Sequence, residues 1–263
     1  MIHTNEKIKG ISLVEILFSL TISLFLLAGV LQVFLNTKQA YRLGSAFDEL
    51  QENVRFLSDY LAKIIRTSGY RSVTDSAMPE LSTLYTVLAP YIQVVDNGGI
   101  NGSDILSLRF QGSGDGAGNP DGSIRDCLEQ PVDANTMVTN VLSINANNEL
   151  ECMSINPNAA SVVSSAVLVS GVENMQVLFG EDIDGDEVPD RYVSPNFAGL
   201  NLNRVVSIQI SFLTASSNEV YLTQDTNTYN LLGTLFKPSP DYRLRKQFSF
   251  TVQLRNVVTH ASS

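Results

Sequence analysis

Four aspartates gather in residues 181–190, which read E-D-I-D-G-D-E-V-P-D. Alternate side chains of a loop can turn toward one hard cation, and carboxylate and carbonyl oxygens are the ligands that calcium prefers. The spacing fits the odd positions of a calcium-binding loop, which gives as predicted ligands Asp182, Asp184, Asp186, the Val188 carbonyl and Asp190. However, Glu187 replaces the usual glycine, and Val193 stands where a bidentate acid is expected. We therefore predict a weak calcium site, with a solvated acidic turn as the alternative.

The chain has two cysteines, Cys127 and Cys152. If they lie outside the cytoplasm, where conditions are oxidising, such a pair is typical of a disulfide. The bridge would stabilise the fold by about 3 kcal/mol, mainly by restricting the unfolded chain. Structural zinc is not expected, because it requires four nitrogen or sulfur ligands. We predict a Cys127–Cys152 disulfide, and the alternative is a pair of buried thiols.

Side chains suited to catalysis are scarce. The two histidines, His3 and His260, lie near the ends of the sequence, which contains no G-x-S-x-G or H-E-x-x-H motif. A glycine-rich stretch at residues 112–117 resembles a dinucleotide fingerprint, but G-N-P at residues 118–120 follows it in place of the required helix. The sequence therefore predicts a protein that is not an enzyme and has no cofactor other than calcium.

The chain is acidic, with a formal net charge of −10 from 17 basic and 27 acidic residues. This balance argues against a nucleic-acid partner. The main basic cluster is R-L-R-K at residues 243–246. Charged residues commonly protect exposed strand edges, so we expect this cluster to form a solvated edge and not a phosphate-binding patch.

One acidic residue, Glu15, lies at the start of a long apolar run. The 19 residues that follow it, 16–34, include only four polar side chains and are long enough to cross a hydrocarbon core of about 30 Å. A carboxylate in such a span costs about 3 kcal/mol on insertion scales and is generally functional. The positive end of a helix dipole and a nearby ammonium would reduce that cost. A plain membrane anchor or a secretory signal are the alternatives, although a secretory signal has a shorter apolar core.

The residues around Glu15 resemble a type IV prepilin signal, since Gly10 precedes I-S-L-V-E at residues 11–15. The resemblance implies that a membrane peptidase, the prepilin peptidase, cleaves after Gly10 and methylates the new amine of Ile11. Glu15 would then pair with the free amine of a neighbouring subunit during assembly. Ile11 replaces the phenylalanine that is usual in the family. Lys7 and Lys9 favour a cytoplasmic N-terminus, which implies a single-pass protein of the bacterial inner membrane that later enters a cell-surface pilus.

The periodicity of apolar residues predicts an α+β fold. Steps of four and three residues extend the helix beyond the membrane, at Leu43, Phe47, Leu50, Val54, Leu57, Leu61 and Ile64, and Gly69 is expected to end it. Strict alternation at residues 106–110, 206–212 and 248–254 predicts strands with one buried face and one solvated face. We expect a leader at residues 1–10, a long helix at 11–68 with its membrane span at 11–35, and a globular domain at 69–263. In that domain one antiparallel β-sheet would pack on the helix, with exposed loops at residues 111–122 and 226–240.

Two C-terminal stretches, E-D-I-D-G-D…D-R-Y-V from residue 181 and F-S-F-T-V-Q-L-R-N at residues 248–256, are similar to those of PilW-type minor pilins. The resemblance implies a type IV pilin-like fold and a subunit that helps to prime pilus assembly. Its partners would be other minor pilins, the major pilin, the inner-membrane assembly platform and a tip adhesin. A J-type minor pseudopilin of type II secretion is the alternative within this superfamily, and a membrane-anchored binding module is the alternative outside it.

Overall fold

The computed structural model describes residues 12–72, 91–115, 117–156 and 163–256. The chain divides into two compact units, Met1–Ser45 and Ala46–Ser263. Helix α1, Leu13–Thr67, contributes its first part to one unit and its second part to the other.

The part of α1 in the first unit has an exposed apolar surface. Each of its leucine, isoleucine, valine and phenylalanine side chains from Leu13 to Leu35 is more than half exposed, and Phe25 reaches 80%. Among the described residues, α1 is the one helix whose length and composition suit a membrane span. This part of α1 therefore has the properties of a membrane anchor, as the sequence predicted.

The part of α1 in the second unit buries one stripe of side chains. Leu50, Leu57 and Leu61 are fully buried, which confirms the predicted steps of four and three, whereas Phe47 remains 39% exposed. The helix ends at Thr67, and Gly69 follows with φ +78°. A side chain at Gly69 would be strained at this φ and would also meet the carbonyl oxygen of Asn256 at 2.9 Å, which explains why glycine ends the helix here.

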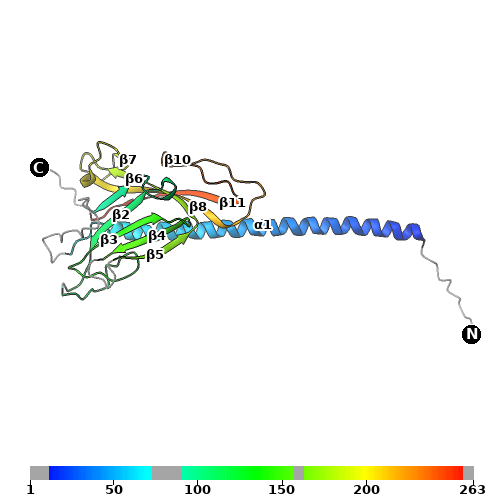
Figure 1. Ribbon diagram of the computed structural model, residues 1–263, viewed down its shortest axis with the longest axis horizontal. Helices are drawn as coiled ribbons and strands as arrows, with labels where there is room; N and C mark the ends of the chain where they lie inside the picture. Colours follow the sequence, from blue (N-terminus) through cyan, green and yellow to red (C-terminus); the bar gives the residue numbers. More distant parts are fainter. Residues whose placement is uncertain (1–11, 73–90, 116, 157–162, 257–263) are drawn as a thin grey trace, which may run out of the picture. The chain divides into compact units, whose positions relative to one another are not determined.

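Two antiparallel sheets follow (Figure 1). The first has five strands in chain order: β1 (Ile92–Val95), β2 (Ile105–Gln111), β3 (Met137–Ile144), β4 (Glu149–Ile155) and β5 (Val163–Ser170). The second has four strands in the spatial order β11 (Arg243–Gln253), β8 (Val205–Glu219), β6 (Val172–Glu181) and β7 (Arg191–Val193). A two-stranded hairpin joins β9 (Tyr229–Leu231) to β10 (Thr234–Phe236), and two short 3₁₀ helices are η1 (Ile100–Gly102) and η2 (Leu202–Arg204).

The division into two larger sheets corrects the prediction of a single sheet. Gly171 separates β5 from β6, with φ +78°, and a Cβ on it would lie 2.5 Å from the carbonyl oxygen of Ala215. At this residue the chain leaves the first sheet and passes against β8 of the second, where the Ala215 N–H donates to the Gly171 carbonyl at 2.7 Å. Such a close approach of two backbones requires glycine.

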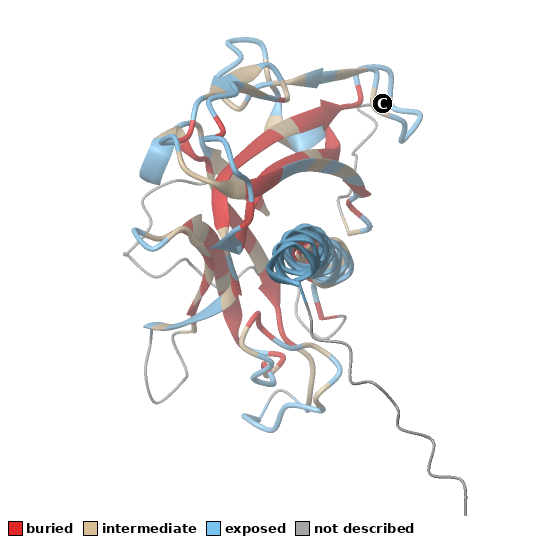
Figure 2. Cartoon of the chain, turned by 90° about the vertical axis from the view of Figure 1, so that its right-hand side faces the viewer, coloured by how far each residue is buried: buried red, intermediate tan, exposed pale blue. Residues whose placement is uncertain are grey.

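One apolar core serves the helix and both sheets. It joins Leu57 and Leu61 of α1 to Leu108 and Leu142 of the first sheet and to buried residues of the second such as Ile210. Figure 2 shows buried residues along the strands of both sheets. The predicted packing of an antiparallel β-structure on the helix is therefore confirmed, with two sheets in place of one.

The polar faces of several strands are also buried, which the alternation did not predict. In β8, Ser207 and Ser211 are 2% and 0% exposed, and Gln176 of the neighbouring β6 is 3% exposed. Their side chains find partners inside the protein: Ser211 accepts from the Ser249 hydroxyl at 2.9 Å, and Gln176 donates to the Gly102 carbonyl at 2.8 Å. Small hydroxyl and amide groups with satisfied hydrogen bonds can be buried at low cost.

The two segments expected to be irregular loops are partly ordered. Residues 226–240 contain the β9–β10 hairpin, whose turn places Leu232 and Gly233 at φ +53° and +99°. A two-residue turn with both φ values positive usually has the sequence Asn-Gly. Because leucine occupies the first position here, the sequence does not carry the usual signal for this hairpin. In the other loop, Gln111 is 2% exposed, and its side chain hydrogen-bonds to residues outside the loop.

A buried carboxylate, Asp104, connects the two sheets just before β2. It is 1% exposed and accepts hydrogen bonds at 2.8 Å from the N–H groups of Asn97 and Val177, while its own N–H donates to the Met175 carbonyl. Burial raises the pKa of Asp104 from 3.8 to about 6, although the two N–H donors oppose this rise. Its proton is therefore held more tightly in the folded protein than in the unfolded chain.

The raised pKa of Asp104 predicts a pH dependence. Between pH 3.8 and about 6 the unfolded chain loses this proton first, so the contribution of Asp104 to stability falls as the pH rises through that window. A shift of about two pKa units corresponds to a fall of at most about 3 kcal/mol across this window, and the opposing effect of the two N–H donors is already contained in the shift. Urea unfolding at several pH values should show this slope in the wild type and not in Asp104→Asn. An identical slope in both proteins would contradict the assignment.

Candidate functional site

The N-terminal part of the predicted site lies at the start of α1. Glu15 occupies the first turn, and one of its carboxylate oxygens lies 3.5 Å from the backbone N–H of Ser12. The first N–H groups of a helix have no hydrogen-bond partners within the helix. A carboxylate at this position can accept a hydrogen bond from one of them, and it also lies at the positive end of the helix dipole. Gly10 and Ile11, the predicted cleavage and methylation residues, lie outside the described residues.

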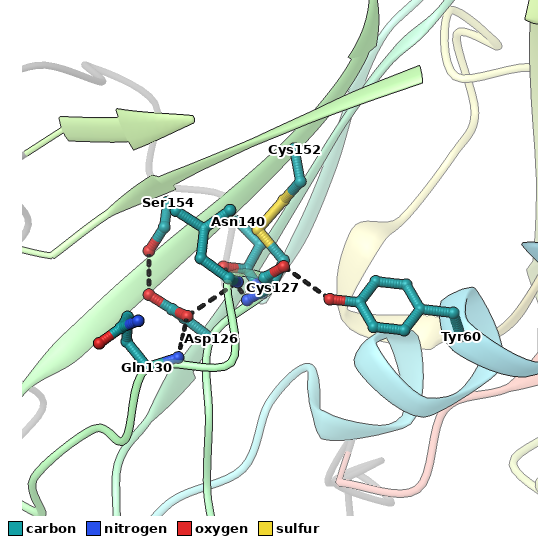
Figure 3. The surroundings of a disulfide bond; sticks show 8 residues. Tyr60, Asp126, Cys127, Gln130, Asn140, Cys152 and Ser154 are labelled. Atoms are coloured by element: carbon teal, nitrogen blue, oxygen red, sulfur yellow. Dashed lines mark hydrogen bonds between the residues drawn. A yellow bond between two sulfur atoms is a disulfide. The ribbon is translucent and has the colours of Figure 1, made fainter. Parts of the chain in front are cut away.

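The predicted disulfide is present: Cys127 and Cys152 are bonded, with their Cα atoms 6.3 Å apart (Figure 3). Cys152 lies in β4, and Cys127 lies in the segment between β2 and β3. From α1, the Tyr60 hydroxyl donates to the Cys127 carbonyl at 2.6 Å. Burial, followed by the nearby charges of Glu129 and Asp126, raises the pKa of Tyr60 to about 12, so the hydroxyl stays protonated as a donor.

A buried aspartate holds the segment around Cys127 in place. Asp126 is 4% exposed, and it accepts the Ser154 hydroxyl at 2.6 Å and the N–H groups of Leu128 and Gln130 at 2.9 and 2.8 Å (Figure 3). The Cys127 N–H donates to the Asn140 side chain of β3 at 3.2 Å. The disulfide therefore belongs to a junction of the helix, two strands and a loop, and its role is structural.

The acidic loop brings three of its five predicted ligands together. One carboxylate oxygen from each of Asp182, Asp184 and Asp190 lies within 4.8 Å of the other two. The carboxylate of Asp186 is not a member of this group and instead accepts the Val188 N–H at 2.9 Å. Asp182 is buried, whereas the other two aspartates of the group are exposed.

Hydrogen bonds to Asp182 shape the loop. Its two carboxylate oxygens accept the N–H groups of Gly185 and Glu187 at 2.6 and 2.9 Å, and although burial acts to raise its pKa, these bonds lower it. Glu187 has φ +67°, so it adopts the left-handed conformation for which glycine is usual at this loop position. For Asp184, the Asp186 N–H acts to lower the pKa, but the surrounding carboxylates outweigh it and raise that pKa.

The base of the acidic loop is closed by an ion pair. Glu181, whose side chain is 3% exposed, accepts from Arg191 at 2.8 Å, and the Glu181 carbonyl accepts the Asp190 N–H at 2.9 Å. The Arg191 guanidinium also lies 4.8 Å from the centre of the Phe197 ring. These contacts hold the two ends of the loop together, which keeps Asp182 and Asp190 adjacent.

A second cluster of charged groups was missed by the sequence analysis and corrects one of its predictions. Arg245, expected on a solvated edge, has a side chain that is only 1% exposed. It donates two hydrogen bonds to Glu173, at 2.7 and 2.9 Å, and further bonds to Asp241 and Asp225 at 2.7 and 3.2 Å. Burial acts to lower the pKa of Arg245, but these acidic partners raise it, so it is charged at all relevant pH values.

This arginine cluster, Arg245 with Glu173, Asp225 and Asp241, fixes the long excursion between β8 and β11. Asp225 also accepts the Tyr229 hydroxyl of β9 at 2.6 Å, and its N–H donates to the Asp241 carbonyl at 2.7 Å. The only hint in the sequence is the alternation of Arg243 and Arg245, which places both on one face of a strand. Nothing local to the sequence identifies partners as distant as Glu173.

Comparison with known proteins gives two findings. Residues 136–256 match the family model PilW, Type IV Pilus-assembly protein W. Among solved structures, the chain is similar to the type IV-like pilin TTHA1219 from Thermus thermophilus. The sequence identity is 15% and the TM-score 0.48, over 79% of this chain and 96% of that chain. No curated protein matches the chain.

The matched PilW segment begins one residue before β3 and ends after β11, so it contains the whole of the second sheet, the acidic loop and the arginine cluster. It lies on the same chain as the prepilin-like N-terminus and the exposed apolar part of α1. The resemblance of the C-terminal stretches to PilW-type proteins is thereby confirmed: residues 136–256 of this chain form a domain of the PilW type, the type IV pilus-assembly protein W family.

Proposed function

We propose that this protein is a minor pilin that helps to prime the assembly of a type IV pilus and takes its place in the tip complex. The observation that carries the proposal is the combination, on one chain, of a PilW-type domain with a helix whose large apolar side chains from Leu13 to Leu35 are all more than half exposed. Such a helix needs an apolar surrounding, which lipid provides before assembly and neighbouring pilin helices provide afterwards. The role is structural, and no catalytic step is required of any residue.

In this proposal the prepilin peptidase removes residues 1–10 and methylates Ile11. The carboxylate of Glu15 then pairs with the N-terminal amine of a neighbouring subunit as the helices pack. Two opposite charges in apolar surroundings attract strongly, so the pair would favour one axial register between adjacent subunits. The major pilin, other minor pilins, the inner-membrane platform and a tip adhesin are the proposed partners.

The experiment that tests this role is affinity purification of the native full-length protein after mild crosslinking in its own cells. Minor pilins and a tip adhesin recovered together would support the proposal. Recovery of secretin and secretion-ATPase components without pilins would favour a pseudopilin of type II secretion instead. Recovery of neither, with an intact leader on the purified chain, would favour a membrane-anchored binding module.

We also propose that the acidic loop binds calcium through Asp182, Asp184 and Asp190. Three carboxylate oxygens within 4.8 Å of one another form a donor set of the hard oxygen type that calcium takes. Bound calcium would cancel the repulsion among these carboxylates and tie β6 to β7. The lack of a bidentate acid at Val193 predicts an affinity near the weak, extracellular range of about 10⁻⁴–10⁻³ M.

Calcium should therefore stabilise the protein against unfolding. At about 10 mM calcium we expect a gain of about 1–3 kcal/mol over the chelator-treated protein. Asp184→Asn should remove most of the gain, whereas Asp186→Asn should keep it, because Asp186 lies outside the group of three oxygens. Thermal unfolding, monitored by circular dichroism, measures the gain in stability. Equal melting temperatures with calcium and with chelator would contradict the proposed calcium site.

A further inference from the structure

The two larger sheets end in four edge strands that differ in their protection against pairing with another chain. β1 and β7 are four and three residues long, and β11 carries the partly exposed Arg243 and the exposed Lys246. β5 has eight residues, V-S-S-A-V-L-V-S, with no charge and no proline. Short length, charge and proline are the usual means by which proteins block edge-to-edge pairing. Among the described edge strands, β5 is thus the long one without a charge or a proline, and its one irregularity is the register shift against β4 that leaves Leu168 as an extra residue.

Among the strands that the structure describes, none covers the outer edge of β5. β5 pairs with β4 on its inner side only, and over residues 164–170 no other described strand pairs with it. Figure 1 places it at the end of the series formed by β2, β3 and β4. Val167 is 47% exposed, which is high for a valine in a sheet strand. An open edge offers alternating N–H and C=O groups, the chemistry that an added β-strand satisfies.

The charge beside this edge is negative. In the register between β4 and β5, Glu151 lies opposite Val167, and Glu149 lies opposite Ser170. Glu149 accepts the Ser170 hydroxyl at 3.2 Å and the Asn145 amide at 2.9 Å. Glu151 is half-buried and forms no ion pair with any residue in the described part of the chain. A strand added to β5 would lie two strand spacings, about 10 Å, from β4, which a lysine or arginine and a glutamate side chain can span together.

We propose that β5 is a docking edge for an extended strand of a different polypeptide, uncharged along most of its length and carrying one lysine or arginine that reaches Glu151. Backbone hydrogen bonds would provide the affinity, and the basic residue would select the partner. A second copy of this chain fits less well, because β5 itself contains no lysine or arginine that could reach Glu151, and both copies would carry the same net charge of −10.

The test uses the full-length protein in detergent micelles and three fluorescent eight-residue peptides of alternating valine and threonine. One peptide has a central lysine, one has glutamate there, and one has the lysine with alternate backbone nitrogens methylated along one edge. Fluorescence anisotropy should show the lysine peptide binding at least tenfold more tightly than the methylated one and several-fold more tightly than the glutamate one. Equal binding of methylated and unmethylated peptides would overturn strand addition, and equal binding of lysine and glutamate peptides would overturn the basic partner.

A charge placed on the edge provides a matched pair of variants. Val167→Lys should weaken the lysine peptide at least tenfold, because it blocks the edge and neutralises Glu151. Leu222→Lys makes the same kind of change at a residue that is 84% exposed and outside the strands, and it should bind like the wild type. Unchanged binding by Val167→Lys would overturn the site, and if this variant fails to fold, the three-peptide comparison on the wild type still decides.

Analytical ultracentrifugation of the same samples measures the oligomeric state, which tests whether a second copy of this chain occupies the β5 edge instead. A dimer of the wild-type chain that Val167→Lys abolishes would assign the edge to a second copy and overturn the choice of a basic strand. A monomer that binds the lysine peptide supports it. These measurements involve no pilus assembly, so the docking edge and the proposed minor-pilin role succeed or fail separately.

Discussion

Replacement of Glu15 by alanine is expected to keep the protein in the membrane and out of the filament. Without the carboxylate, the N-terminal amine of the neighbouring subunit would be buried among apolar helices with no counter-charge, at a cost of about 3 kcal/mol. Since 1.4 kcal/mol corresponds to a factor of ten, incorporation should fall roughly a hundredfold. Quantitative immunoblotting of sheared pili and of membranes from the same cells measures this ratio.

The matched control for this prediction is Gln32→Ala, which removes a polar group from the same exposed apolar part of α1 but no charge. It should enter pili at the wild-type level. Both variants should still be processed after Gly10, because the role proposed for Glu15 is in packing and not in cleavage. Wild-type amounts of processed Glu15→Ala protein in the pilus fraction would contradict the assigned role of the carboxylate.

Replacement of Arg245 by methionine is expected to cost about 3–5 kcal/mol of unfolding free energy, because removal of one member of a buried ion pair leaves uncompensated charge. The side chains of Glu173 and Asp225 are 6% and 5% exposed, and Asp241 is also partly buried. Their mutual repulsion without the guanidinium should also loosen the β9–β10 hairpin, which the cluster holds through Asp225 and Tyr229. Urea unfolding of the full-length protein in detergent gives the loss in stability.

Arg55→Met is the control for the arginine cluster. Arg55 pairs with Glu52 on α1 at 3.0 Å, but the two side chains are 72% and 67% exposed. Exposed pairs of this kind contribute little to stability because water screens the charges, so the variant should unfold close to the wild type. If Arg245→Met lost no more unfolding free energy than Arg55→Met, the arginine cluster would not stabilise the segment between β8 and β11, and the prediction would be contradicted.

The features that could be predicted from the sequence are those set by local periodicity. The burial of Leu50, Leu57 and Leu61 follows from their spacing, since a helix repeats its faces every three to four residues whatever lies beyond it. The core faces of β2 and β8 follow from alternation in the same way. The pairing of Cys127 with Cys152 follows because the chain has no other cysteine.

The features that could not be predicted depend on residues far apart in the chain. Arg245 finds Glu173 at a separation of 72 residues, and neither residue is distinguished by its neighbours in the sequence. The transfer of the chain between sheets at Gly171 depends on its contact with Ala215 of β8. Asp186 fits the calcium-loop spacing but turns its carboxylate to the Val188 N–H, a choice made by the loop backbone and not by residue type.

The central claim is that this chain is a prepilin whose helix is trimmed to present Glu15 near its new terminus. Intact-mass spectrometry of the protein purified from native envelopes tests this claim most directly. The account predicts a chain that begins at Ile11, carries one methyl group, and shifts to the untrimmed mass in a Gly10→Val variant. A native protein that still begins at Met1, with no shorter form in any envelope fraction, would contradict it.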